Sequence, residues 1–180
     1  MSPPVARRSD RLELRRLDAR DADFVQALYA DARVTRWLLR IQKPITRAHA
    51  LQICGDPAPA DTEHRFGAVL VPSVRLVGLG VVRSSRERAR VASIGYSITP
   101  AVWGQGFGTE LARLLVAFAT ATLGAGEIRA TTLDDHHASR RILEKLGFAI
   151  HQSGVEEADS RGEVRRVTRW VLHASPMRTP

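Results

Sequence analysis

The sequence is poor in several residue types on which whole classes of protein depend. Its 180 residues include one cysteine, and only 6% are aromatic. A single thiol cannot form an internal disulfide, which excludes a cysteine framework and favours a reducing compartment. No apolar run approaches the roughly 18 residues of a membrane-spanning helix. The first residues carry two arginines but no apolar stretch after them, unlike a signal peptide. We therefore expect a cytoplasmic protein with no membrane partner.

Negative charge is scarce relative to positive charge. The chain has 27 Lys and Arg against 19 Asp and Glu, which gives a formal net charge of +8. Such an excess suits nucleic acid, an acidic protein or a polyanionic cofactor, or it is simply a solvated surface. The basic residues are spread along the chain, and the aromatic residues do not interleave with them as base-stacking platforms would. Nucleic acid is therefore not the expected partner.

Apolar periodicity predicts one α/β domain with no repeat and no linker. Alternating runs predict strands near 11–17, 66–71, 75–83, 91–98, 128–133, 148–155 and 164–172. Helical spacing predicts helices near 21–29, 34–39, 46–54, 109–123 and 138–146. This order predicts a mixed, mostly antiparallel twisted sheet of about six to seven strands with helices on both faces. We expect a disordered arm over residues 1–10, the domain over 11–173 and a tail over 174–180.

A glycine-rich turn separates the strand near 91–98 from the helix that follows it. Gly104, Gly106 and Gly108 alternate directly before that helix. Backbone N–H groups and the helix dipole attract anions at such a place, and glycine lets a phosphate approach closely. Thr109 stands where the dinucleotide fingerprint needs a glycine, and no Gly-Lys-Ser/Thr ending follows. The turn therefore predicts an anion site of another kind, or a turn that only caps the helix.

Two segments together resemble the GNAT superfamily of N-acetyltransferases, and most closely its ribosomal-protein-alanine acetyltransferase branch. The branch shows I-G-Y, then W-G-x-G-[YF]-[AG]-T-E, then N-x-x-S with L-E-K-L-G-F. The two matching segments here are 94–110 and 134–148. The first contains Ile94-Gly95-Tyr96 and Trp103-Gly104-Gln105-Gly106-Phe107-Gly108-Thr109-Glu110. The resemblance covers 11–172 and implies the GNAT fold. It also implies direct transfer of an acetyl group from acetyl-CoA, as cosubstrate, to a primary amine, with no metal.

The resemblance assigns the cofactor site residue by residue. Tyr96, Ser97 and Ile98 would hold the pantetheine arm through their backbone, and the Ile98 N–H would polarise the thioester carbonyl as an oxyanion donor does. The pyrophosphate would lie on the backbone N–H groups of Trp103, Gly104, Gln105, Gly106, Phe107, Gly108 and Thr109.

The resemblance is weaker for the groups that move protons. His136 stands where the branch has Asn, so it is either a cofactor contact or an exposed loop histidine. Ser139 matches the branch's serine, which can protonate the departing CoA thiolate, but a serine there can also cap the helix. Many other members use a tyrosine one turn further on, where this chain has Leu143. A base must deprotonate the amine, and Glu63 and Glu87 are the candidates.

The acceptor stays open at this point. In the family, the early helices and the last hairpin build the acceptor side. Here they carry Arg33, Arg36, Arg40, Arg161, Arg165 and Arg166. A basic face would favour a peptide N-terminus, on an acidic peptide or a ribosomal protein, over a polycation. The alternatives are a small-molecule amine, or a catalytically weak module that binds RNA or an acidic partner. Trp37, Trp170 and the strand edges could support a homodimer.

Overall fold

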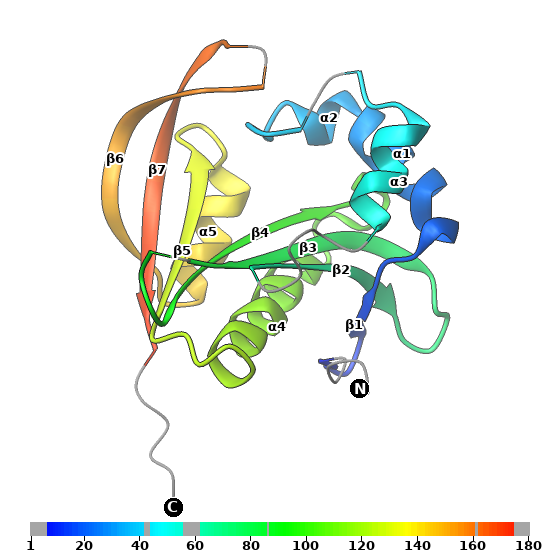
Figure 1. The fold of residues 1–180 in the computed structure, drawn as a ribbon, viewed down its shortest axis with the longest axis horizontal. Coiled ribbons are helices and arrows are strands. Elements are labelled where there is room, and N and C mark those ends of the chain that lie inside the picture. The colour runs from blue at the N-terminus through cyan, green and yellow to red at the C-terminus, as the bar shows by residue number, and fades with distance from the viewer. Residues whose placement is uncertain (1–6, 42–43, 56–61, 86, 161, 175–180) are drawn as a thin grey trace, which may run out of the picture.

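A computed structural model describes residues 7–41, 44–55, 62–85, 87–160 and 162–174. Seven strands form one sheet in the order β1-β2-β3-β4-β5-β7-β6 (Figure 1). Every neighbouring pair is antiparallel except β4 and β5, which run parallel. The strands are β1 (Leu12–Arg16), β2 (Glu63–Leu70), β3 (Leu76–Ser84), β4 (Val91–Ile98), β5 (Glu127–Leu133), β6 (Ala149–Ala158) and β7 (Val164–His173). The predicted mixed, mostly antiparallel sheet is confirmed.

Helices cover both faces of this sheet, as predicted (Figure 1). One face carries α1 (Ala22–Ala30), α2 (Ala32–Thr35) and α3 (Arg47–Cys54), and the other carries α4 (Phe107–Ala121) and α5 (His137–Lys145). Neighbouring residues of β3 show the division, because adjacent side chains of a strand point to opposite faces. Leu79 packs in the cluster of α1 and α3, whereas Gly80 lies under α4. Among the described helices, none combines the length and the apolar composition needed to cross a membrane.

Helix α4 is held close to the sheet by its apolar stripe. Leu111, Leu115 and Phe118 follow the helical period and are at most 1% exposed. A Cβ atom on Gly80 would lie only 2.8 Å from Leu115 Cδ2, so glycine in β3 permits this close approach. The packing sets the N-terminus of α4 beside the end of β4, where the site lies.

The predicted N-terminal arm is corrected where the structure describes it. The backbone N–H of Leu14 donates to the carbonyl of Arg7, and that of Ser9 donates to Leu12, each at 2.8 Å. Residues 7–10 therefore fold back along β1, because β1 is an edge strand whose backbone groups need partners. Residues 1–6 and 175–180 lie outside the described residues.

The expectation that Trp170 could support a dimer is also corrected. This side chain is 2% exposed, and its Nε1–H donates to Thr132 Oγ1 at 2.9 Å. An indole buried on an inner strand with a hydrogen-bond partner belongs to the core. Trp37 is half-buried and stacks on another ring of the same chain, described below.

Candidate active site

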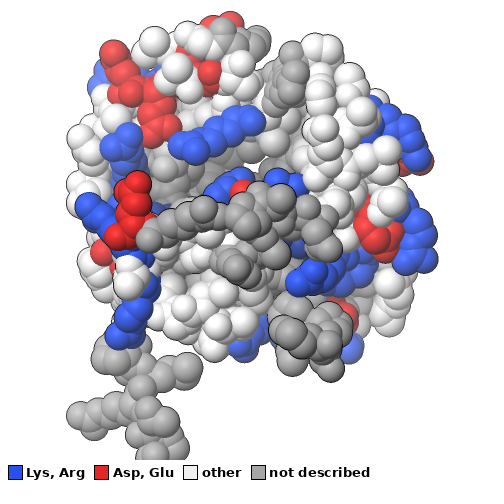
Figure 2. All heavy atoms as spheres, viewed as in Figure 1, with Lys and Arg blue, Asp and Glu red and all other residues white. Residues whose placement is uncertain are grey.

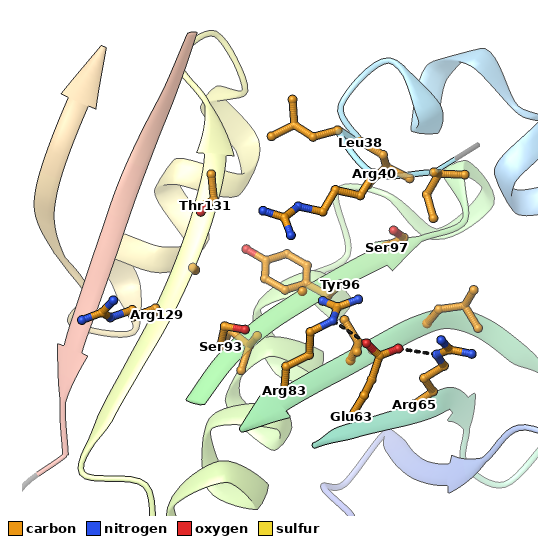
Figure 3. A pocket seen from close by; sticks show the side chains of 18 of the residues that line it. Leu38, Arg40, Glu63, Arg65, Arg83, Ser93, Tyr96, Ser97, Arg129 and Thr131 are labelled. Carbon is orange, nitrogen blue, oxygen red and sulfur yellow. Dashed lines mark hydrogen bonds and ion pairs between the residues drawn. The ribbon is translucent and has the colours of Figure 1, made fainter. Parts of the chain in front are cut away.

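The central feature of the site is a fork between β4 and β5. These parallel strands pair only from Val91 to Ser93 on β4 and from Glu127 to Arg129 on β5. Beyond that point β4 continues to Ile98 and β5 to Leu133 without pairing with each other, and Figure 3 shows the opening between them. The fork leaves strand-edge backbone groups facing each other inside the sheet.

The backbone of Ile98 faces this fork. Thr99 donates its N–H to the carbonyl of Val77 in β3 at 2.9 Å. Successive residues of a strand direct their backbone groups to opposite sides of that strand. The N–H and C=O of Ile98, and by the same alternation those of Tyr96, therefore point away from β3 and toward β5. The backbone of Ser97 points to β3 instead, so the structure directs this predicted contact away from the fork.

The glycine loop begins where β4 ends. Gly104 and Gly106 have φ values of +77° and +84°, a left-handed conformation that L side chains rarely adopt. Gly106 is the N-cap of α4, and the N–H groups of Phe107 and Gly108 precede the first bonds of the helix. Thr109, predicted to contact the pyrophosphate, instead donates its N–H to the carbonyl of Gly106 at 3.1 Å. Phe107 is buried at the start of the helix, whereas Gly104, Gln105 and Gly106 are exposed. The loop can therefore present its N–H groups to an anion.

Two side chains fix the loop in place. The Nε1–H of Trp103 donates to the carbonyl of Ile98 at 2.8 Å, which ties the loop to the end of β4. Arg11 donates to the carbonyl of Gln105 at 3.1 Å and lies 4.5 Å from the centre of the Phe107 ring. The guanidinium of Arg11 also binds Glu110 in the first turn of α4 at 2.5 Å. These contacts hold the loop conformation before any ligand arrives.

A cleft of about 1080 Å³ extends from the fork across the face that carries α1 and α3. Figure 2 shows Lys and Arg side chains around the hollow in this face. Arginines outnumber glutamates among the residues that line the cleft, which gives it an excess of positive charge. The six arginines are Arg40, Arg65, Arg83, Arg88, Arg129 and Arg169, and the three glutamates are Glu63, Glu127 and Glu157. An arginine partner already binds each of these glutamates. The cleft therefore presents a positive surface to whatever enters it.

Of the arginines predicted to form the acceptor face, Arg40 lines the cleft, and Figure 3 shows its side chain directed toward Tyr96. Arg33 instead binds Asp31 at 2.7 Å, and Arg36 lies over the Trp37 ring at 4.2 Å. Arg165 and Arg166 are on β7 and do not line the cleft, and Arg161 lies outside the described residues. The basic lining comes mainly from strand arginines, because alternation directs them to this face.

The two candidate bases differ in position. Glu63 lies in the cleft with its carboxylate bound to both Arg65 and Arg83 at 2.5 Å (Figure 3). Burial alone would raise the pKa of Glu63, but the two guanidinium groups outweigh it and hold the pKa below the usual range. Glu87 is exposed in the turn before β4 and does not line the cleft. The structure therefore brings Glu63, and not Glu87, to the site.

Ser139 and Tyr96 meet at the fork. Ser139 is in the first turn of α5, and its Oγ lies 2.9 Å from the hydroxyl oxygen of Tyr96 on β4. Leu143, one turn further along α5, is fully buried in the core. The hydroxyl groups at this place thus come from a strand and a helix that are far apart in the sequence.

His136, at the start of α5, contacts the segment that follows α2. Its ring stacks on Trp37, with centroids 4.2 Å apart and planes inclined by 16°. Burial lowers the pKa of His136 to about 4, helped by the charges of Arg36 and His137 and opposed by Asp135. The imidazole is therefore neutral at neutral pH and is not the freely exposed loop residue that was one interpretation. In the described part of the chain, no three His, Cys, Asp or Glu side chains gather as metal ligands would.

Sequence reasoning missed three groups that the fold brings to the site. These are Arg11, which holds the loop, the hydroxyl of Tyr96, and Tyr29, which lines the cleft near Ser97. Burial raises the pKa of Tyr29, so its hydroxyl remains protonated. One signal was available, since Tyr96 and Tyr29 are the only two tyrosines in the chain.

Comparisons of the sequence and of the structure with known proteins identify the family and the fold. Residues 11–149 match the family described as Acetyltransferase (GNAT) domain. The Bacillus subtilis (strain 168) protein "Uncharacterized N-acetyltransferase YoaA" is 30% identical over 142 residues, covering 78% of this chain and 80% of that protein. Two Vibrio cholerae structures share the fold at 20% identity. One is a spermidine N-acetyltransferase in complex with CoA and spermine, with a TM-score of 0.82 and coverage of 93% and 98% of the two chains. The other is a candidate ribosomal-protein-serine acetyltransferase, with a TM-score of 0.76 and coverage of 97% and 100%. The chain belongs to the GNAT acetyltransferase family and is an acyltransferase.

Proposed function

We propose that this protein transfers the acetyl group of acetyl-CoA to the primary amine at the N-terminus of an acidic peptide or of a protein such as a ribosomal protein. The observation that carries the proposal is the fork between β4 and β5, which opens next to the glycine loop. An extended amide-bearing chain can add to a free strand edge through backbone hydrogen bonds, and the pantetheine arm is such a chain. A diphosphate can bind the N–H groups of a helix N-terminus.

The chemistry follows from the groups around the fork. The N–H of Ile98 can donate to the thioester oxygen as negative charge develops there, and Ser139 can protonate the departing thiolate. Glu63 is the cleft carboxylate proposed to receive the amine's proton. Its lowered pKa keeps it ionised at neutral pH, although it also makes Glu63 a weak base. His136, neutral and at the N-cap of α5, is proposed to contact the pantetheine arm from the opposite side of the fork.

The charge of the cleft supports an acidic acceptor. The lining arginines outnumber the glutamates, and Arg40 has no carboxylate partner within the described part of the chain. A cleft lined by an excess of positive charge repels a polycation and attracts an anion. The spermidine acetyltransferase of Vibrio cholerae therefore shares the fold without indicating the acceptor of this chain.

A screen of acceptors tests the proposal, with the variants Arg40→Gln and Arg113→Gln, which lose the same charge. Release of the free CoA thiol is measured with three acceptors. These are a peptide with acidic residues after its free N-terminus, the same peptide with lysines at those positions, and spermidine. We expect the acidic peptide to be preferred. Arg40→Gln should raise the KM for that peptide by about tenfold, since a hydrogen bond to a charged group contributes roughly 1.5–3 kcal/mol.

Arg113→Gln is the control, because Arg113 is exposed on α4 and does not line the cleft. A preference for spermidine, or equal KM values in the two variants, would overturn the acidic-acceptor proposal. Absence of transfer to any amine, together with RNA binding that weakens steeply with salt, would favour the binding-module alternative.

A further inference from the structure

The two hydroxyl groups at the fork form a chain that leads from the strand to the helix. The Tyr96 hydroxyl oxygen and Ser139 Oγ are 2.9 Å apart, within hydrogen-bond distance. Tyr96 lines the cleft, and Figure 3 shows its ring in the opening between β4 and β5. Ser139 approaches the same point from α5, on the opposite face of the sheet from α1 and α3.

The geometry points to Tyr96 as the positioning residue of a proton relay, whose hydroxyl donates its proton to Ser139 while Ser139 protonates the CoA thiolate. This inference rests on the proposed function, because it needs acetyl-CoA in the fork. It assigns a role to the Tyr96 side chain, beyond the backbone contact that the resemblance implies for this residue.

The order of the two hydroxyl groups follows from their acidity and surroundings. A phenol is a stronger acid than an aliphatic alcohol, so Tyr96 is the natural donor and Ser139 Oγ the acceptor between them. Burial raises the pKa of Tyr96 to about 12, and the hydrogen bond to Ser139 only partly opposes this. The phenol therefore remains protonated at neutral pH and keeps a proton available to donate.

The step is balanced without any further reactant. The amine nitrogen forms a bond to the acetyl carbon, the carbon–sulfur bond breaks, and sulfur leaves with the electron pair. The Ser139 proton moves to sulfur, and the Tyr96 proton moves to Ser139 Oγ. Glu63 receives the proton that the acceptor nitrogen loses, and this proton then returns through solvent to the Tyr96 phenolate. The net transfer is therefore from the nitrogen to the sulfur.

The core packing explains why a strand tyrosine is needed here. Position 143 of α5 holds a leucine that is fully buried, so that turn of the helix supplies no hydroxyl to the fork. Tyr96 reaches the first turn of α5 from β4 instead. Serine alone is a weak acid, and a neighbouring phenol that donates to its oxygen stabilises the charge that develops there as its proton leaves.

A double-mutant cycle in acetyl transfer tests the relay. We expect Ser139→Ala to lower kcat by about a hundredfold, the lower end of the range found for general acids. Tyr96→Phe, which removes only the group that assists Ser139, should lower kcat by about tenfold, the effect of one hydrogen bond of about 1.4 kcal/mol. The double variant should be no slower than Ser139→Ala alone, because groups that act as one unit are not additive. The KM for acetyl-CoA should change little in Tyr96→Phe, since the removed oxygen acts in the transition state.

Tyr29→Phe is the matched control, because Tyr29 is the other tyrosine of the cleft and lies near Ser97 instead of Ser139. Its effect on kcat should add to that of Ser139→Ala. Additive effects of Tyr96→Phe and Ser139→Ala, or an unchanged kcat in Tyr96→Phe, would overturn the relay. A wild-type protein that transfers no acetyl group would instead overturn the proposed function on which the relay rests.

Discussion

Replacing Gly106 by alanine separates backbone strain from ligand binding in the glycine loop. Gly106 has a φ of +84°, and a Cβ atom there would meet only the Arg11 Nη2 at 3.5 Å, which is ordinary contact. The penalty is therefore backbone strain, about 1–2 kcal/mol for an L residue in the left-handed region. In a protein of this size that lowers Tm by about 2–8 °C, from roughly 2–4 °C for each kcal/mol.

Gly124→Ala is the matched control for that strain. Gly124 has a φ of +65° and no atom within 4 Å of the added Cβ, and it follows the opposite end of α4. We expect its Tm to fall by a similar amount. If acetyl-CoA then raises the Tm of the two variants by different amounts, the difference reports on the contribution of Gly106 to ligand binding at the N-terminus of α4.

Thermal unfolding with and without acetyl-CoA supplies the measurement. At 100 times its Kd a ligand adds about 2.7 kcal/mol of stability, which should raise the Tm of the wild type and of Gly124→Ala by about 5–11 °C. A tenfold loss of affinity in Gly106→Ala would reduce this to about 1.4 kcal/mol at the same concentration. If both glycine variants show the full wild-type response to acetyl-CoA, the loop does not hold the pyrophosphate and the reasoning fails.

Two further predictions concern the residues that frame the fork. The folded state keeps the pKa of His136 at about 4 against an ordinary 6.5, so the unfolded chain binds more protons between these values and stability should fall as pH falls through that window. Allowing for partial exposure, the loss is about 1–2 kcal/mol. In the His136→Asn variant this loss of stability should disappear, as measured by urea unfolding at pH 7 and pH 4.5. If the unfolding free energy of the variant depends on pH as that of the wild type does, the assigned pKa shift is wrong. Trp103→Phe removes the 2.8 Å bond to the Ile98 carbonyl, so acetyl-CoA affinity should fall by about two- to tenfold in calorimetry. An unchanged Kd would show that the indole does not help to shape the site.

The sequence by itself determined the class of fold and the place of the loop. Period-two and helical spacing predicted the element order, because each pattern is set by which residues face a core. The bounds of β4 were predicted as found, since Pro100 interrupts the alternation. Helix α4 begins and ends two residues earlier than the predicted 109–123, because it starts directly after Gly106. The predicted disordered arm over 1–10 missed the pairing of residues 7–10 with β1. Pairing with an edge strand depends on a neighbour, and local composition does not record it.

Only the tertiary structure decided how the site is assembled. The fork exists because β4 and β5 stop pairing after Ser93 and Arg129, and no local pattern marks where two parallel strands separate. The same holds for the meeting of Tyr96 with Ser139, 43 positions apart in the chain. Propensity and periodicity act over a few residues, whereas contacts of this range are set by how the sheet twists and which face each helix covers.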